Sequence, residues 1–314
     1  MKALLHYRAS KGFRALLDSA RPEWLDIVVV DEADDTAFAN EMADAHAVLH
    51  VLRPLGSVDM DLATNLGLIQ KIGVGVNTID LQAAESRGIA VANMPGTNNP
   101  AVAETALLLM LAAFRRATYF DRLTRAGSGW RAEAEAYDEV GEIGGKTIGL
   151  VGYGAVPQRL APILQAMGAE VLYTATGPKD HAVGRYCSLE ELVRQSDVIS
   201  LHVPLTPETD QLFDANMFGK MKPGVVLVNT ARGGLVDEAA LVQALRSGHV
   251  RAAGLDVFAE EPVDPSNPLL SMDNVTCLPH LAWLTPETLQ RSLDICIENC
   301  RRLRDGEPIL HQVI

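Results

Sequence analysis

The chain has 314 residues, of which 48% are hydrophobic and 21% are charged, and this composition is typical of a globular protein rather than a disordered one. A chain of this length is expected to divide into about two domains. The formal net charge of -13 and the sequence pI near 5.0 argue against nucleic acid or a membrane surface as the main partner.

Short strand-forming runs alternate with helix-forming stretches in the N-terminal part of the chain. The predicted strands are residues 2–6, 27–30, 48–51 and 68–72. This alternation indicates parallel βα units. The next segment, from Ala101 to about Ala126, has an apolar period that predicts one long helix, with Pro100 in its first turn. We expect this helix to connect two domains.

A second series of βα units begins at Thr147. Its predicted strands are near-continuously apolar and comprise residues 147–151, 171–174, 198–202, 225–229, 253–257 and 275–278. Such strands are buried on both faces, as in a doubly wound parallel sheet. A last helix is predicted from Pro286 to Arg304 and could return to the first domain. We therefore predict an α/β fold of two doubly wound parallel-sheet domains, the second inserted within the first.

The N-terminal segment and the cysteines indicate a cytoplasmic protein. Polar residues at positions 6–8 interrupt the first apolar run, and the longest apolar run, 106–114, is far shorter than the roughly 20 residues that span a bilayer. The cysteines are too few and scattered for a disulfide framework. Cys296 and Cys300 lie one helical turn apart, but no second ligand pair accompanies them, so we expect structural thiols and no metal site.

A glycine-rich turn joins the strand at 147–151 to a helix-forming stretch. Its sequence is Gly152-Tyr153-Gly154-Ala155-Val156. Gly152 permits a tight turn, Gly154 lets the backbone approach a pyrophosphate, and the helix N-terminus supplies N–H groups. This context predicts a dinucleotide site, and the alternative is a structural turn without a ligand. Pro157 replaces the third glycine of the fingerprint, which the first turn of a helix tolerates.

The strand after the glycine turn ends without the usual carboxylate. An Asp or Glu about 20 residues after the glycines normally binds the adenosine ribose and repels a 2′-phosphate. Here Ala175 stands between Thr174 and Thr176, and Lys179 follows. Hydroxyl and ammonium groups donate hydrogen bonds to phosphate, so we predict that NADP(H) is favoured over NAD(H). The alternative is a solvated loop and a protein that is indifferent between the two cofactors.

Three further strand ends carry candidate catalytic side chains. Arg232 follows the strand at 225–229, at the edge of the sheet where ligands bind in this architecture, and it could clamp a carboxylate. Glu261 and His280 follow the next two strands. Each alone is a weak signal, because a lone histidine is more often structural than catalytic and Glu261 could belong to a solvated acidic loop.

In their order, these segments resemble the D-isomer-specific 2-hydroxyacid dehydrogenase family over nearly the whole chain. The matching segments are residues 73–77, 102–104, 152–154, 202–206, 229–233, 256–262 and 279–280. The resemblance implies a flavodoxin-like substrate domain of residues 1–98 and 285–314, an inserted nucleotide-binding Rossmann domain of residues 99–284, and a homodimer built on the inserted domain. Two residues depart from the pattern: Asn77, where many relatives have Asp, and Pro157.

The resemblance also implies the catalytic set, which is Arg232, Glu261 and His280. Hydride transfer to a keto carbon builds charge on the carbonyl oxygen, so His280 is expected to be the general acid, and Glu261 is expected to orient its ring. Arg232 would pair with the substrate carboxylate and polarise the carbonyl. Backbone N–H groups at Val74 and Gly75 would give the carboxylate a second anchor.

Other residues are expected from the resemblance to line the cofactor and the substrate. Asp256 would accept a hydrogen bond from the nicotinamide carboxamide, and Trp283 would narrow the substrate pocket. The residues expected at the dinucleotide are Gly152, Tyr153, Gly154, Ala155, Val156, Thr174, Thr176, His202, Val203, Pro204, Thr206, Thr230, Ala231, Arg232, Asp256, His280 and Ala282.

These expectations describe an oxidoreductase that reduces a small 2-keto acid, with glyoxylate or hydroxypyruvate favoured, to the D-2-hydroxy acid. One alternative is a corepressor-like scaffold that binds the dinucleotide to control assembly, but a scaffold does not need an intact catalytic set. Another is a dehydrogenase for a sugar acid or for formate. Formate oxidation needs no proton transfer, so the pair formed by His280 and Glu261 would match it poorly.

Overall fold

The computed structural model describes residues 1–314, which fold into two compact units. The first unit consists of Met1–Asn98 and Leu284–Ile314, and the second consists of Asn99–Trp283. The return of the chain to the first unit lies one residue before the position expected from the sequence. No helix is both long enough and apolar enough to cross a membrane.

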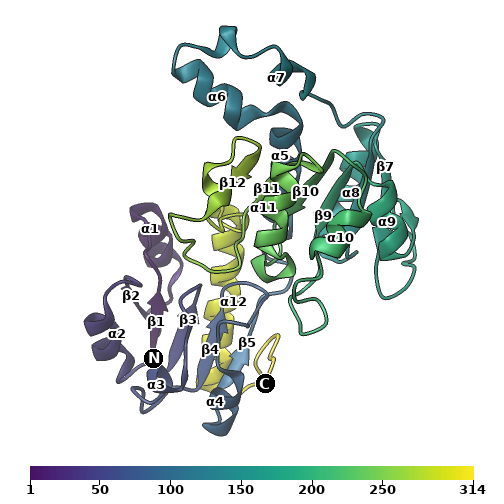
Figure 1. The fold of residues 1–314 in the computed structure, drawn as a ribbon. Coiled ribbons are helices and arrows are strands. Elements are labelled where there is room, and N and C mark those ends of the chain that lie inside the picture. The colour runs from purple at the N-terminus through teal and green to yellow at the C-terminus, as the bar shows by residue number, and fades with distance from the viewer. The chain divides into compact units, whose positions relative to one another are not determined.

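The first unit is built on a five-stranded parallel sheet with the order β2-β1-β3-β4-β5 (Figure 1). The strands are β1 (Lys2–His6), β2 (Asp26–Val30), β3 (Ala47–His50), β4 (Leu68–Lys71) and β5 (Ala90–Ala92). The helices are α1 (Lys11–Ala20), α2 (Asp35–Met42), α3 (Ser57–Met60), α4 (Leu81–Ser86) and α12 (Pro286–Asp305). The strands β3 and β4 are buried at every position, as inner strands of a doubly covered sheet must be.

The C-terminal segment is attached to this sheet by a buried amide pair. Asn299 of α12 donates to Gln70 Oε1 at 2.5 Å and to the carbonyl oxygen of Leu310 at 3.0 Å, while its own Oδ1 accepts from the Leu310 N–H at 2.8 Å. Cys296 and Cys300 lie on the same helix and are fully buried, as expected of structural thiols.

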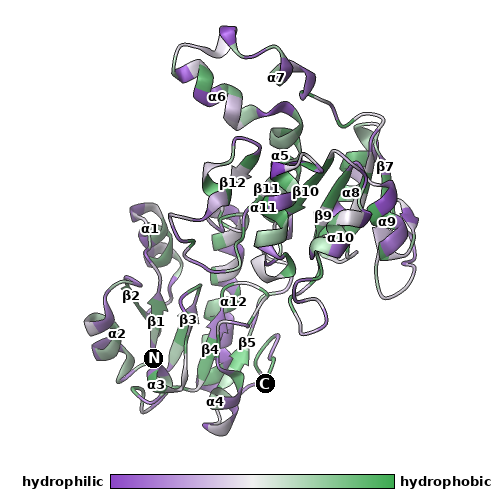
Figure 2. Ribbon diagram, viewed as in Figure 1, coloured by the Kyte–Doolittle hydropathy of each residue, from purple (hydrophilic) through white to green (hydrophobic).

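The second unit is built on a seven-stranded parallel sheet with the order β12-β11-β10-β9-β6-β7-β8. The strands are β6 (Thr147–Val151), β7 (Glu170–Thr174), β8 (Arg185–Tyr186), β9 (Val198–Leu201), β10 (Val225–Asn229), β11 (Val250–Leu255) and β12 (Val275–Cys277). The helices that cover the sheet are α5 (Asn99–Arg115), α8 (Ala155–Ala166), α9 (Leu189–Gln195), α10 (Ala215–Lys220) and α11 (Glu238–Arg246). Figure 2 shows the central strands as largely hydrophobic. The predicted α/β architecture of two parallel sheets is thereby confirmed.

The long helix predicted from Ala101 to Ala126 is wrong in one respect, because the chain forms two helices there. The helix α5 ends at Arg115 and α6 (Ala117–Arg125) follows, with Arg116 between them in the left-handed region at φ 46°. The Arg116 guanidinium bonds Glu139 at 2.7 Å, which stabilises the break. Arginine is an ordinary helix former, so the local sequence carries no signal of this break.

The helix α5 belongs to the core of the second unit rather than serving only as a connector. Leu109, Met110 and Phe114 are buried against the sheet. A Cβ on Gly254 of β11 would lie 2.7 Å from the Cβ of Leu109, so a glycine is needed where helix and strand meet.

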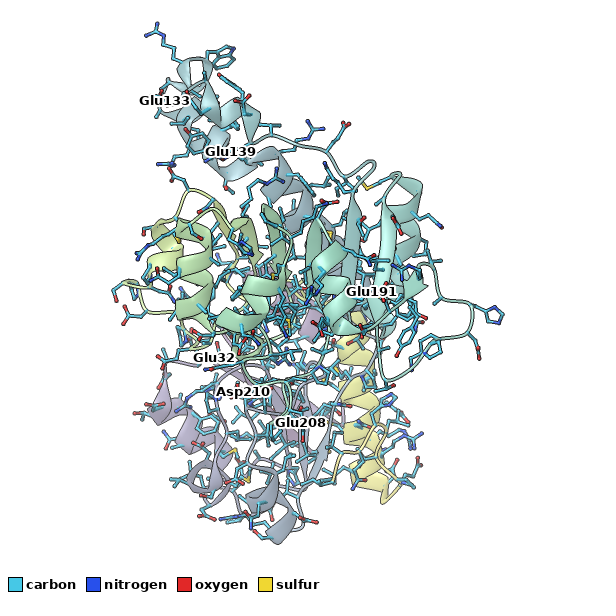
Figure 3. The ribbon with its side chains drawn as sticks, turned by 45° about the vertical axis from the view of Figure 1, so that its right-hand side comes forward. Glu32, Glu133, Glu139, Glu191, Glu208 and Asp210 are labelled. Atoms are coloured by element: carbon cyan, nitrogen blue, oxygen red, sulfur yellow. The ribbon has the colours of Figure 1, made fainter.

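A segment after α5 projects from the rest of the second unit, and we call it the arm. It comprises α6, η1 (Gly129–Arg131) and α7 (Glu135–Asp138) (Figure 1). Figure 3 labels Glu133, between η1 and α7, and Glu139, directly after α7. The arm leaves large side chains exposed, because α6 buries no residue and Trp130 is 86% exposed.

Candidate active site

The glycine turn between β6 and α8 has the geometry of a phosphate cradle. Gly152 has φ 97°, and a Cβ there would lie 2.7 Å from the carbonyl oxygen of His202, so only glycine fits. Gly154 precedes the first turn of α8, and a Cβ on it would meet no atom within 4 Å. The space in front of the helix N-terminus is therefore open to a ligand that seeks N–H groups. Pro157 is buried in the first turn, where its missing N–H breaks no helical bond.

Two neighbouring strand ends carry buried polar atoms without a hydrogen-bond partner. These atoms are Nε2 of His202, directly after β9, and Oγ1 of Thr230, directly after β10. Burial lowers the pKa of His202 to about 3, so its ring is neutral near neutral pH. Buried polar groups are almost always bonded, and these two therefore fit a site that a polar ligand completes.

The loop after β7, where the carboxylate is missing, is held by two tyrosines. The Tyr153 hydroxyl donates to the carbonyl oxygen of Val183 at 2.9 Å and accepts from the Val183 N–H at 2.8 Å. The Tyr173 hydroxyl accepts from the Lys179 N–H at 2.9 Å. The loop that presents Thr176 and Lys179 to solvent is thus fixed to the end of the sheet at two points.

Arg232 stands on a turn that Asn229 shapes. The Asn229 side chain accepts from the Ala231 N–H at 3.0 Å and donates to the carbonyl oxygen of Arg232 at 2.8 Å. Burial lowers the pKa of Arg232, and the nearby carboxylate of Glu261 opposes that change, so the guanidinium remains a cation. Sequence reasoning missed the role of Asn229, although an Asn at the end of a strand commonly forms such a turn.

Glu261 and His280 form a close pair. Nδ1 of His280 lies 2.6 Å from Oε2 of Glu261, and Oε1 of Glu261 accepts from the Phe258 N–H at 2.9 Å. Burial would raise the pKa of Glu261, but the bond and charge of His280, the Phe258 N–H and the charge of Arg232 together lower it. Glu261 is therefore a carboxylate that takes the Nδ1 hydrogen and leaves Nε2 for other chemistry.

The turn that carries His280 is held in an unusual conformation by Asp256. His280 has φ 54°, in the left-handed region that a non-glycine residue seldom occupies. Its N–H donates to the carbonyl oxygen of Asp256 at 2.7 Å, and the N–H groups of Leu281 and Ala282 donate to the Asp256 carboxylate at 2.9 Å each. The indole of Trp283 donates to the carbonyl oxygen of His280 at 3.1 Å. Asp256 and Trp283 thus position the histidine, a role that the sequence did not indicate.

The loop with Val203, Pro204 and Thr206 packs beside the Arg232 turn. Thr209 Oγ1 donates to the carbonyl oxygen of Pro204 at 2.7 Å and accepts from the Thr206 N–H at 2.8 Å. The N–H of Gln211 donates to the carbonyl oxygen of Gly234 at 2.8 Å. The acidic side chains labelled in Figure 3 as Glu208 and Asp210 also belong to this loop.

Val74 and Gly75, the expected second carboxylate anchor, belong to the first unit, after β4. Their turn is held by Asn93, whose side chain donates to the carbonyl oxygen of Val74 at 2.9 Å, and by the Met94 N–H, which donates to the carbonyl oxygen of Gly73 at 2.8 Å. Val74 is 45% exposed, and neither its N–H nor that of Gly75 donates a hydrogen bond within the unit. Such a pair of N–H groups suits an anion.

Comparisons with a family model and with known proteins point to the same family. Residues 107–282 match the NAD-binding domain of D-isomer specific 2-hydroxyacid dehydrogenases. The chain is 40% identical over 306 residues to the D-3-phosphoglycerate dehydrogenase of Mycobacterium leprae, covering 95% of this chain and 56% of that protein. It is 39% identical over 260 residues to the glyoxylate reductase of Aeropyrum pernix, covering 80% of this chain and 78% of that protein.

Among solved structures, the NAD-dependent formate dehydrogenase of Staphylococcus aureus in complex with NAD matches with a TM-score of 0.88 at 27% identity, covering 100% of this chain and 99% of that one. The chain spans little more than half the length of the phosphoglycerate dehydrogenases it matches. The matched residues 107–282 lie inside the second unit, which carries the glycine turn and the residues Arg232, Glu261 and His280. The chain belongs to the D-isomer-specific 2-hydroxyacid dehydrogenase family.

Proposed function

We propose that this protein reduces a small 2-keto acid to the D-2-hydroxy acid, with a nicotinamide dinucleotide as the reductant. The observation that carries this proposal is the pair of His280 and Glu261, whose Nδ1 and Oε2 atoms lie 2.6 Å apart on strand ends of the unit that also presents Arg232. A bound reduced nicotinamide supplies a hydride to the keto carbon. The residues of this chain then hold the acid and move one proton.

His280 is the proposed proton donor. Because Glu261 accepts the Nδ1 hydrogen, Nε2 of the protonated ring is left to donate to the substrate oxygen as the C=O bond becomes C–O–H. The same nitrogen accepts the proton in the oxidative direction. The His280 side chain is 21% exposed, so solvent can return the proton after each turnover.

Arg232 is the proposed partner of the substrate carboxylate. Its guanidinium is a planar donor fork that can bond a carboxylate and also polarise the adjacent carbonyl, which favours charge on that oxygen. The N–H groups of Val74 and Gly75 are the proposed second anchor, because they are held in place and make no bond within their own unit.

The proposed cofactor is NADP(H) in preference to NAD(H). The residues that would hold it are the glycine turn, His202 and Thr230 with their unpaired buried atoms, and the loop after β7. That loop offers Thr176 and Lys179 and has Ala175 in place of a repelling carboxylate. The tyrosine bonds fix the loop before a ligand arrives, which reduces the entropy lost on binding.

Glyoxylate and hydroxypyruvate are the proposed substrates. The support is the relative named glyoxylate reductase, which this chain covers to 78%, and the bulky indole of Trp283 fixed beside His280, which favours small acids. The relatives named D-3-phosphoglycerate dehydrogenase make 3-phosphohydroxypyruvate the rival substrate.

The test is the loss of reduced-nicotinamide absorbance with purified protein and glyoxylate, hydroxypyruvate, pyruvate or 3-phosphohydroxypyruvate, with NADPH and NADH in parallel. Turnover of glyoxylate or hydroxypyruvate, faster with NADPH, supports both parts of the proposal. Faster turnover of the phosphorylated acid would change the substrate, and a gain of absorbance in a parallel reaction with formate and the oxidised cofactors would change the reaction. Dinucleotide binding without turnover of any acid would favour the scaffold.

We also propose that the protein is a cytoplasmic homodimer formed through the second unit. The support is the arm, on which Trp130 is 86% exposed and Tyr137 is 49% exposed, because large apolar side chains in solvent commonly mark an interface. Sedimentation equilibrium of the wild type and of Trp130→Ser tests this. A wild-type monomer at micromolar concentration would exclude the dimer.

A further inference from the structure

The loop that carries Glu261 is held by a carboxylate outside the proposed catalytic set. Glu238 is the first residue of α11, and its Oε1 accepts from the Ala259 N–H at 2.7 Å. Its Oε2 accepts from the Asn267 side-chain amide at 2.8 Å. The Glu238 side chain therefore bonds both ends of the loop from Phe258 to Asn267, and Glu261 lies between the two bonded residues.

The same loop is in direct contact with the Arg232 turn. A Cβ on Gly233 would lie 1.9 Å from the carbonyl carbon and oxygen of Phe258, so these two backbones touch without a side chain between them. The segment from Arg232 to Glu238 is short and ends in a capped helix, since Asp237 accepts from the Ala240 N–H at 3.1 Å. Glu238 thus stands at the capped start of α11, and this helix supports the loop that carries Glu261.

We propose that Glu238 is a positioning residue for the pair of Glu261 and His280. The Phe258 N–H bonds Oε1 of Glu261, and the next N–H, that of Ala259, bonds Glu238, so successive peptide groups fix the start of the loop. Without Glu238, the Ala259 N–H and the Asn267 amide both lose their acceptor. The loop is then no longer fixed at its two ends, and the Glu261 carboxylate is no longer held against Nδ1 of His280. A displacement of about 1 Å at a catalytic group typically costs about a hundredfold in rate.

This inference rests on the proposed function for its kinetic test, and two variants address it. Glu238→Ala removes both acceptors, and we expect kcat to fall about 10- to 100-fold, with the dinucleotide Kd changed by less than about twofold. Glu238→Gln keeps an oxygen that accepts from the Ala259 N–H, but its NH2 group then faces the NH2 group of Asn267 and both are donors. We therefore expect a smaller loss of kcat than in Glu238→Ala. Glu190→Ala, which removes a carboxylate from the first turn of α9 in the same unit, is the matched control and should retain wild-type kcat.

A second substitution tests whether the bond itself matters. In the double variant Glu238→Gln with Asn267→Asp, the glutamine amide can donate to the new carboxylate while its oxygen still accepts from Ala259. We expect kcat to return to within about threefold of the wild type, because the hydrogen bond between residues 238 and 267 is restored with its donor and acceptor exchanged. Failure of the double variant to exceed Glu238→Gln alone would overturn the proposal.

A spectroscopic measurement separates this inference from the proposed function. Proton NMR of histidine-labelled protein should show a strongly downfield Nδ1 proton for His280 in the wild type and in the Glu190→Ala control, and no such signal in Glu238→Ala. A wild type that turns over no keto acid but shows this pattern would remove the proposed function and keep the positioning role. An unchanged signal and unchanged kcat in Glu238→Ala would overturn the positioning role.

Discussion

The carboxyl ends of the two parallel sheets differ in how their polar groups are satisfied. In the first unit, His6, His50 and Lys71 end β1, β3 and β4, and all three are buried. His50 Nε2 donates to the carbonyl oxygen of Arg53 at 2.8 Å, Arg53 donates to His6 Nε2 at 3.3 Å, and Lys71 donates to the carbonyl oxygen of Val51. These three side chains are therefore satisfied within the unit.

The corresponding edge of the second sheet is incomplete. His202 and Thr230 follow β9 and β10, and each keeps a buried polar atom without a partner, while Arg232, Glu261 and His280 follow neighbouring strands. The side chains at the strand ends are therefore satisfied within the protein in the first unit, and in the second unit two of them keep the capacity to bind a ligand. A histidine at a strand end therefore indicates a binding site only where one of its ring nitrogens lacks a hydrogen-bond partner within the protein.

The largest expected effect separates the histidines of the two edges. His280→Gln should lower kcat with glyoxylate by about 10²- to 10⁴-fold, the usual contribution of a general acid, and leave the dinucleotide Kd within about twofold. His50→Gln, at the edge of the first sheet, should lower kcat by less than about threefold. Steady-state kinetics and dinucleotide titration measure both, and similar losses in the two variants would end the distinction.

A second variant tests the proposed carboxylate clamp. Arg232→Lys keeps the charge but replaces the planar fork with a single ammonium, so kcat/KM should fall about a hundredfold. Arg185→Lys, on an exposed arginine paired with Glu191, should leave kcat/KM unchanged. Kinetics on glyoxylate at saturating cofactor give the answer, and full activity of Arg232→Lys would mean that another group holds the acid.

The buried histidines at the edge of the first sheet should make the protein sensitive to acid. Burial lowers the pKa of His50 to about 3 and that of His6 to about 4, the latter with help from the charge of Arg53. The unfolded chain binds these protons near pH 6.5 and the folded chain does not, so stability is full above that value and is lost as pH falls toward 4.

Each of these histidines should contribute a slope of roughly 1.4 kcal/mol per pH unit within that window. Denaturant unfolding of the wild type and of His50→Gln between pH 7 and pH 4.5 measures the slope, which should be shallower in the variant. Identical slopes would mean that His50 is protonated in the folded protein.

The smallest expected effect concerns the loop after β7. Lys179→Ala should raise KM for NADPH about three- to tenfold, by the loss of one charge-assisted bond, and leave KM for NADH unchanged. Lys220→Ala removes a lysine of α10, outside the loop, and serves as the control. An equal rise for both cofactors would show that the loop does not discriminate between them.

The sequence was most informative where burial dominates local structure. The strand at 225–229 was predicted with its observed bounds, because four successive apolar residues followed by Asn229, all buried, leave few alternatives. The strands β5 and β8 were missed, since runs of three and two residues carry no period. At the break, Arg116 pairs with Glu139, which lies far along the chain, and no local pattern reports such a bond.

The site was predictable in its reactive groups and not in their supports. Arg232, Glu261 and His280 follow apolar runs, and their order alone marks them. The supporting roles of Asn229, Asp256 and Glu238 consist of hydrogen bonds to backbone groups and, for Glu238, also to the Asn267 side chain, and these bonds depend on how turns fold rather than on residue type. A supporting carboxylate and a solvated one have the same signature in a single sequence.

The contiguity of the second unit has a consequence for how new specificities arise. Every proposed proton-transfer group and its supports lie between Asn99 and Trp283, whereas the anchor at Val74 and Gly75 is encoded in the flanking segment. Recombination at the two junctions would exchange the segments that flank the second unit between relatives and keep the second unit, with its reactive residues, intact. An exchange of the flanks would therefore change the anchor at Val74 and Gly75, while every proposed proton-transfer group stays encoded in one uninterrupted segment.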